Sequence, residues 1–328
     1  MPILCRVTRG DLTESIHVIF ATVVDDSGHI VFSTGDPNYL TCIRSSAKPF
    51  QAGAAIKSGA IKAAGFDESE IALMCASHLG EPIHVKTAKS MLAKIGCTVE
   101  DYECGIHAPA DVSSRHELIK NEGKLTSFHN NCSGKHAGML ILSKLMNGKT
   151  SGYANLTSMV QQRILGTLEF MTGLDLMQYT HGIDGCGAPV FSAPLGNWAR
   201  AFALFAGGGE LPETRHNACQ RIRKSIAAEP LYIAGHDRAC TAINSAYGEA
   251  ITVKTGAEGV YSAAFHELGL GTVLKARDGN KRGAEVAIGA VIRALGYPTD
   301  GLVKDFFEPK LLNWAGEEVG DITTPQLH

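Results

Sequence analysis

Reactive side chains are concentrated between residues 130 and 139, where the sequence reads Asn-Asn-Cys-Ser-Gly-Lys-His-Ala-Gly-Met. An apolar helical pattern, made by residues 139–142 and Leu145, follows, so we predict a loop that enters a helix. Backbone N–H groups point outward at the start of a helix, where the helix dipole favours negative charge. The thiol of Cys132 would have a lowered pKa there and could act as a nucleophile or a metal ligand. Considered alone, a free cysteine is more often a small buried hydrophobic residue.

A Ser-x-x-Lys motif occupies Ser45 to Lys48. On a helix these two side chains would lie one turn apart on the same face. A lysine with a lowered pKa can accept the proton of a serine and turn the serine into a nucleophile. The motif is short enough to recur by chance, and its ordinary interpretation is a capping serine with a solvated lysine.

A Lys-Thr-Gly motif, Lys254 to Gly256, lies at the end of a predicted C-terminal strand. In penicillin-recognising enzymes, a Ser-x-x-Lys at a helix start faces a Lys-Thr-Gly on a strand edge. The two motifs in this order are stronger evidence than either alone. A clear Ser-Asp-Asn, the third motif of those enzymes, is missing, which disfavours β-lactam chemistry.

Two cysteines in separate glycine-rich loops, Cys132 and Cys186, could supply two thiolates to a zinc ion. The spacing alone makes His136 or His181 the candidate third ligand, although surface and core histidines are commoner than ligands. The residues alone leave this choice open.

The segment Cys75-Ala-Ser-His-Leu-Gly-Glu81 brings a serine, a histidine and a glutamate close together in sequence. A Ser–His–Glu triad is conceivable, but residues so close in sequence rarely point at one another. A helix C-cap at Gly80 is the alternative interpretation.

The composition excludes several classes of protein. The chain has 328 residues, of which 45% are hydrophobic and 19% charged, so we expect a large core in about two domains or in one α/β unit with a second lobe. The net charge of −3 argues against nucleic-acid and membrane partners. No apolar run approaches the roughly 18 residues of a membrane span, and the first residues lack a signal-peptide pattern. Nine cysteines without a Cys-x-x-Cys predict reduced thiols, and we expect a cytoplasmic protein.

Hydrophobic patterns predict the elements that must position these side chains. We expect strands at 3–8, a hairpin of 17–24 with 29–33, and C-terminal strands at 250–254, 259–262 and 268–275. Helices are expected near 50–64 (with interruptions at Gly53 and Gly59), 68–78, 82–95, 134–147, 155–172, 190–206, 212–228 and 284–295, with 97–130 mostly loop. The pattern predicts an α+β fold in which both chain ends supply one antiparallel sheet and residues 45–230 are mostly helical.

With these motifs in place, the chain resembles the rhizobial-type L-asparaginases, the asparaginase II or class 3 family, which have a serine β-lactamase/glutaminase-like fold. The resemblance covers almost the whole chain and implies that residues 1–328 form a single catalytic unit. Arg9-Gly10, Glu14 and His17 near the start fit it too. The stretches that carry it are 44–51, 75–81, 131–139, 184–189 and 254–260.

The resemblance implies hydrolysis of L-asparagine to L-aspartate and ammonia by a homodimer. It implies two catalytic Ser–Lys pairs, Ser45 with Lys48 and Ser77 with Lys254. We favour Ser45 as the residue that forms the acyl-enzyme, because its lysine is fixed one helical turn away.

The resemblance also implies one zinc ion per subunit, which would assist substrate binding rather than the chemistry. Its ligands would be a water and the side chains of Cys132, Lys135 and Cys186. Lys135 thus replaces the histidine that the spacing suggested. Further residues expected to bind substrate are Arg44, Asn131, Asp184 and Glu81.

Two alternatives remain open from the sequence. The first is a glutaminase or another amidohydrolase of the penicillin-recognising fold, because one methylene is worth only about 1–3 kcal/mol of discrimination in a pocket. The second is a non-catalytic binding protein that zinc stabilises, in which loss of Ser45 would change nothing measurable.

Overall fold

The computed structural model describes residues 1–207, 209 and 211–327, apart from the side chain of Asn147. Its contacts divide the chain into two compact units. The first comprises Met1–Ser46, Ala193–Gly209 and Ala250–His328, and the second comprises Ala47–Ser192 and Glu210–Glu249. Within the described residues, no helix combines the length and the apolar character needed to cross a membrane.

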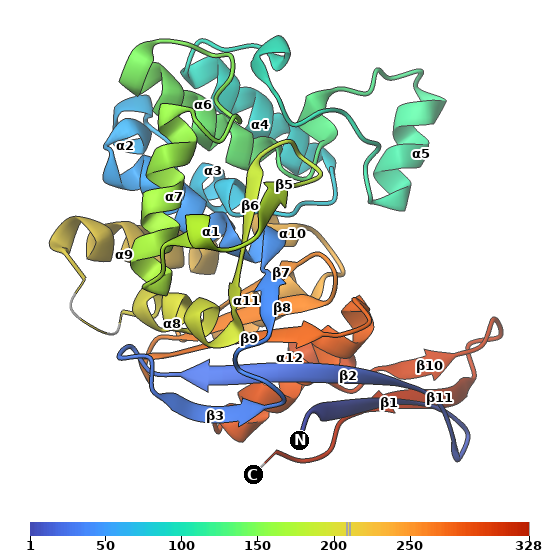
Figure 1. The fold of residues 1–328 in the computed structure, drawn as a ribbon. Helices are drawn as coiled ribbons and strands as arrows, with labels where there is room; N and C mark the ends of the chain where they lie inside the picture. The colour runs from blue at the N-terminus through green and yellow to red at the C-terminus, as the bar shows by residue number, and fades with distance from the viewer. Residues whose placement is uncertain (208, 210, 328) are drawn as a thin grey trace. The chain divides into compact units, whose positions relative to one another are not determined.

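The first unit is built on an eight-stranded antiparallel sheet whose strands come from both ends of the chain (Figure 1). Its strand order is β10-β11-β1-β2-β9-β8-β7, with β3 paired to β2. The strands are β1 (Ile3–Arg9), β2 (Leu12–Val24), β3 (Ile30–Thr34), β7 (Ile251–Gly256), β8 (Val260–Phe265), β9 (Leu270–Ala276), β10 (Lys310–Leu312) and β11 (Glu318–Thr323). The predicted sheet from both chain ends is therefore confirmed, as is the predicted hairpin of β2 with β3.

Two helices, α8 (Leu195–Phe205) and α12 (Lys281–Ala294), cover opposite faces of this sheet. A Cβ at Gly271 in β9 would overlap the backbone of α8, so glycine is what lets α8 lie close. A Cβ at Gly283 of α12 would overlap the side chain of His17 on β2, so α12 also lies close to the sheet. Gly271 pairs with Val24 in β2, and His17 and Val24 point to opposite faces because strand side chains alternate. The smaller elements of this unit are β4 (Leu40–Cys42), α13 (Lys304–Phe307) and a 3-10 turn at Gly301–Val303.

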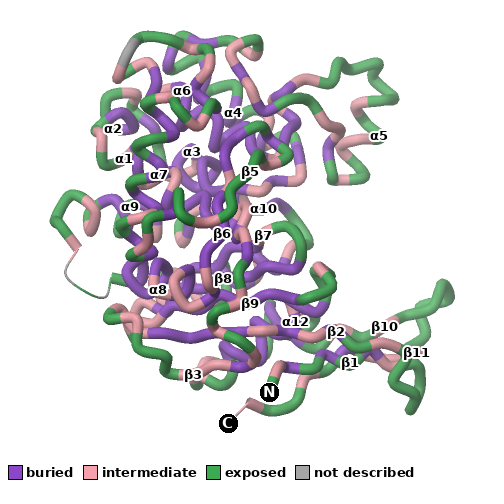
Figure 2. Tube along the Cα trace, in the orientation of Figure 1, coloured by how far each residue is buried: buried purple, intermediate pink, exposed green. Residues whose placement is uncertain are grey.

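The second unit is mostly helical, as predicted for residues 45–230. Figure 2 shows the central helices of this unit, such as α3 and α6, largely buried, while α5 is exposed. Its helices are α1 (Lys48–Lys57), α2 (Ala60–Ala64), α3 (Glu68–Met74), α4 (Pro82–Lys94), α5 (Val112–Lys120), α6 (Ser133–Asn147), α7 (Met159–Thr172), α9 (Glu213–Ala228), α10 (Leu231–Ala234) and α11 (Ala239–Tyr247). Short 3-10 turns occupy Val99–Asp101, Ser127–His129 and Leu176–Gln178, and β5 (His181–Ile183) pairs with β6 (Pro189–Pro194).

One sequence prediction of local structure was wrong, and the structure refines two others. The single helix expected at 190–206 is strand β6 followed by helix α8. The segment 97–130, expected to be mostly loop, contains helix α5. The helix expected at 50–64 is broken between α1 and α2 at Gly59, whose φ is +82°.

Candidate active site

The predicted site residues divide between the two units. Arg44, Ser45 and Lys254 belong to the first unit, and the others belong to the second. The predicted pairs Ser45–Lys48 and Ser77–Lys254 each combine one residue from either unit, and both pairings stay predictions.

In the first unit, the Ser-x-x-Lys segment runs beside the Lys-Thr-Gly strand. The Oγ of Ser46 donates to the carbonyl oxygen of Lys254 at 2.8 Å. A Cβ at Gly256 would overlap the carbonyl oxygen of Ile43, so the glycine permits this close approach. The structure therefore brings together two motifs that are separated by about 200 residues in the sequence.

Arg44 opens the 3-10 turn Arg44–Ala47 with a φ of +52°. A non-glycine residue in this left-handed region is strained, and such strain gathers at functional sites. Lys254 is buried, and its Nζ donates to the carbonyl oxygen of Thr255 at 2.8 Å.

In the second unit, the amine of Lys48 meets the hydroxyl of Ser77. Lys48 is the first residue of α1 and is 1% exposed. Its Nζ lies 3.1 Å from Ser77 Oγ and 3.3 Å from the carbonyl oxygen of Asn131, and it also contacts the carbonyl oxygen of Ala76. The Lys48 amine therefore donates to two carbonyl oxygens and to the Ser77 hydroxyl.

Ser77 stands just beyond the end of α3, where backbone bonds fix its position. Its N–H donates to the carbonyl oxygen of Ile233 at 3.0 Å, and the N–H of Leu79 donates to that of Ala234 at 3.1 Å. Residues 77–79 are thus held along α10. Their position depends on a segment more than 150 residues later in the chain.

The carboxylate of Glu81 contacts His236 in the loop that follows α10. Its Oε1 accepts from the backbone N–H of His236 at 2.8 Å, and its Oε2 lies 2.7 Å from the Nδ1 of the same residue. Both oxygens of this buried carboxylate are therefore engaged by His236.

His78 supports the start of α6, a role that the sequence did not reveal. Its Nδ1 accepts from the backbone N–H of Gly80 at 3.1 Å, so Nε2 carries the proton and donates to Ser133 Oγ at 2.9 Å. Burial lowers the pKa of His78 well below its usual value, and the nearby His84 and Lys48 lower it further. The ring is therefore neutral near pH 7.

The loop that enters α6 is held by amide contacts. The Nδ2 of Asn130 donates to the carbonyl oxygen of Cys104 at 2.7 Å, and its Oδ1 accepts from the N–H of Cys132 at 2.8 Å. His107 Nε2 accepts from the N–H of Asn131 at 2.9 Å. The sequence analysis missed His107 and the contact of Asn130 with Cys104, because these partners lie some 25 residues apart and one of each pair lies in a segment without periodicity.

Cys132, Lys135 and Cys186 form a buried cluster of two sulfurs and one amine. Lys135 Nζ lies 2.9 Å from Cys186 Sγ. A hydrogen bond from Cys186 lowers the pKa of the Cys132 thiol well below its usual value, and Lys48 and Lys135 also favour the thiolate. Sulfur and nitrogen donors are those that zinc prefers, so the three residues fit the donor set of a zinc site.

Neither His136 nor His181 completes this cluster. Among the described residues, no three or more histidine, cysteine or acidic side chains gather as they would to hold a metal. His181 is exposed, and His136 Nδ1 lies 2.8 Å from Tyr153 Oη. Asp184 lies in the turn that carries Cys186, where its Oδ1 accepts from the N–H of Gly185 at 2.7 Å.

A buried lysine within hydrogen-bond distance of a serine hydroxyl is the arrangement of hydrolases that activate serine with an amine. The family model described as L-asparaginase II matches residues 5–324. The chain belongs to the L-asparaginase II family, and this membership supports amidohydrolase activity.

Solved structures with a similar fold were also found, at low sequence identity. A protein named Mglu, crystallised in its native form in NaCl, is 14% identical with a TM-score of 0.48; the match covers 86% of this chain and 62% of Mglu. A β-lactamase from Mycobacterium bovis is 14% identical with a TM-score of 0.40, over 84% of this chain and 94% of that one. A D-alanine carboxypeptidase from Burkholderia cenocepacia is 14% identical with a TM-score of 0.38, over 80% and 88% of the two chains. These likenesses are too loose to carry a functional conclusion. No curated protein sequence matches the chain significantly.

Proposed function

We propose that this protein is an L-asparaginase that hydrolyses L-asparagine to L-aspartate and ammonia through a serine acyl-enzyme. The observation that carries the proposal is the buried amine of Lys48, which contacts the Ser77 hydroxyl in a chain of the L-asparaginase II family. We further propose that it acts as a cytoplasmic homodimer.

Lys48 acts as the general base in this proposal. Its lone pair takes a serine proton while the serine oxygen bonds to the side-chain amide carbon of asparagine. The C–N bond then breaks, the proton passes to the leaving nitrogen, and ammonia departs. A water molecule adds to the acyl-enzyme, releases aspartate and returns a proton to the serine.

Two serines are candidates for the acylated residue. Ser45 precedes it by three residues in a continuous helical turn, and Ser77 accepts the contact of its amine. We retain Ser45 as the acylated residue and propose that Ser77, with Lys254, relays the proton in the water step. Arg44, Asn131, Lys135, Asp184 and Glu81 are proposed to hold the substrate, Glu81 through the position of His236.

Zinc, if bound, would be held by Cys132, Lys135 and Cys186. It would supply positive charge for orienting the substrate, and no step above requires it. Lys135 must be neutral to bind a metal, so binding would release a proton.

The test is ammonia release from asparagine and from glutamine by the purified protein and by Ser45→Ala, Ser77→Ala and the exposed control Ser113→Ala. We expect release from asparagine that only the control variant retains, with an acyl-enzyme seen by mass spectrometry in Ser77→Ala. An acyl group in Ser45→Ala would move the nucleophile to Ser77. Faster release from glutamine would reassign the substrate, and a folded protein that releases ammonia from neither amide would overturn the proposal.

A further inference from the structure

A cavity of about 520 Å³ lies in the second unit, away from Lys48 and the cysteine cluster, at the C-terminal end of α1. Gly59 and Gly65 line it, and the space beside each is empty, since a Cβ built at either would meet nothing within 4 Å. The volume is that of pockets that hold small organic molecules. Its apolar lining comprises Ile56, which is partly exposed, and Ile61, Phe66 and Ile71, which are buried behind it.

The charged residues at this cavity are all cationic. Lys57, Lys62 and Arg221 line it. Arg221 is already paired, with its Nη1 2.8 Å from the carboxylate of Glu68. In the part of the chain that the structure describes, no carboxylate lies within ion-pair distance of Lys57 or Lys62.

Further cationic side chains, outside the lining of the cavity, act on Lys57. Burial lowers the pKa of Lys57, and the guanidinium groups of Arg215 and Arg163 lower it further. Arg215 stacks on an aromatic ring, with its Cζ 4.1 Å from the ring centroid of Phe170. Like charges gathered in this way repel, and a bound anion would relieve the repulsion.

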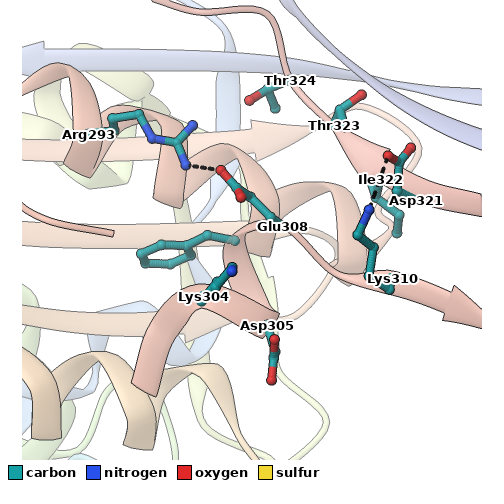
Figure 3. Close-up of a pocket in the computed structure, with 10 residues that line it drawn as sticks. Arg293, Lys304, Asp305, Glu308, Lys310, Asp321, Ile322, Thr323 and Thr324 are labelled. Atoms are coloured by element: carbon teal, nitrogen blue, oxygen red, sulfur yellow. Dashed lines mark hydrogen bonds and ion pairs between the residues drawn. The ribbon is translucent and has the colours of Figure 1, made fainter. Parts of the chain in front are cut away.

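A second cavity differs from this one in that carboxylates pair with its cations. This cavity of about 300 Å³ lies in the first unit beside α13 and β11 (Figure 3). Two of its cations are neutralised by carboxylates, since Arg293 pairs with Glu308, and Lys310 lies 3.9 Å from Asp321. The cavity at the end of α1 lacks such neutralisation at its lysines.

We propose that the cavity at the end of α1 binds a small amphiphilic anion, with its apolar chain or ring against the isoleucines and its carboxylate or phosphate head against Lys57 and Lys62. An apolar wall alone would accept a neutral molecule, and two lysines alone would attract any anion. Together they favour a ligand that has both parts. The limited volume favours a small molecule over a peptide.

Calorimetric titration of the full chain with octanoate, octan-1-ol and inorganic phosphate tests the proposal. We expect octanoate to bind at least tenfold more tightly than either of the other two. If octan-1-ol binds as tightly as octanoate, the lysines do not contribute to binding. If phosphate binds as tightly as octanoate, the apolar residues do not contribute. Either result overturns the proposal. A titration with octyl phosphate then shows which head group the site prefers.

Matched variants locate the binding. The double variant Lys57→Gln/Lys62→Gln should weaken octanoate binding at least tenfold, because it removes the cations proposed to hold the carboxylate. Both side chains are exposed, so their loss should leave the fold intact. The control Lys86→Gln/Lys120→Gln removes the same net charge from exposed sites elsewhere and should bind octanoate normally. Unchanged binding by the first variant, or an equal loss in the control, would show that octanoate does not bind here.

Discussion

The amine of Lys48 is held by backbone carbonyls and a hydroxyl rather than by a carboxylate. Carbonyl and hydroxyl oxygens accept hydrogen bonds from the Lys48 amine, so the buried nitrogen has partners without a carboxylate. This environment satisfies the hydrogen bonds of the buried amine. It also explains why such a residue can be buried without an opposite charge.

Replacing Lys48 by methionine should abolish turnover and leave the fold intact. The variant keeps the length of the side chain but removes the general base, a loss that lowers rates by about 10²–10⁴-fold. Lys144→Met is the matched control, because the Lys144 amine also donates to a backbone carbonyl, that of Ile95, at 2.6 Å. The measurement is ammonia release from asparagine together with circular dichroism. Activity within a few fold of wild type in Lys48→Met would exclude Lys48 as the base.

Zinc loading should depend on Cys132 and Cys186. After exposure to zinc and desalting, we expect about one zinc ion per chain by elemental analysis, and at least a tenfold loss of zinc in Cys186→Ala. Cys97→Ala removes another buried thiol and should retain the metal. Equal zinc content in all three proteins would leave the cysteine cluster without a metal role.

At the scale of elements, the helix α6 approaches α3 closely at a glycine. A Cβ at Gly134 would overlap the carbonyl oxygen of Leu73, while Gly166 in the middle of α7 has open space around it. The first glycine therefore sets the distance between two helices, and it lies between Ser133 and Lys135. The second has no such constraint.

Gly134→Ala and Gly166→Ala should change stability in opposite directions. The first forces backbone apart and should cost at least about 1–3 kcal/mol, the range for overpacking a core. The second should stabilise α7 by up to about 1 kcal/mol, because alanine is the better helix former. Urea unfolding followed by circular dichroism measures both. A stable Gly134→Ala would show that α6 can shift away from α3 without loss.

Sequence patterns located the elements that have one buried face and missed those that do not. Helix α7 was predicted within a few residues because its apolar positions repeat with a helical period. Helix α5 has no buried residue, so no such period exists; only the cap at Asp111, which accepts from the N–H of Ser114, marks its start. Strand β6 and helix α8 are both mostly buried, so their apolar residues read as one run.

The sequence named candidate site residues but not all the contacts that the structure gives them. The Ser-x-x-Lys and Lys-Thr-Gly motifs were linked by analogy with penicillin-recognising enzymes, and the structure places Ser46 against Lys254. The contact of Lys48 with Ser77 depends on how the end of α3 lies beside the start of α1. No local spacing encodes that tertiary arrangement.

At the scale of the whole molecule, two buried histidines in the second unit should make the stability of the fold depend on pH. The rings of His78 and His84 stack with centroids 4.9 Å apart, and the edge of Tyr232 meets His84 at 6.2 Å. Burial is the main cause that lowers the pKa of both histidines. Protonating either would place a charge in a dry environment beside a second imidazole.

The stability of the protein should therefore fall as the pH drops below about 6.5, the ordinary pKa of histidine. Below that pH the unfolded chain binds protons at these rings and the folded chain does not, so the free energy of unfolding decreases with decreasing pH. His84→Phe keeps a ring against Tyr232 and removes one titrating group, so its urea midpoint should change less between about pH 7.5 and pH 5.5 than that of wild type. The exposed control His181→Gln should follow wild type. A pH response in His84→Phe as steep as that of wild type would show that this ring contributes nothing to the acid sensitivity of the fold.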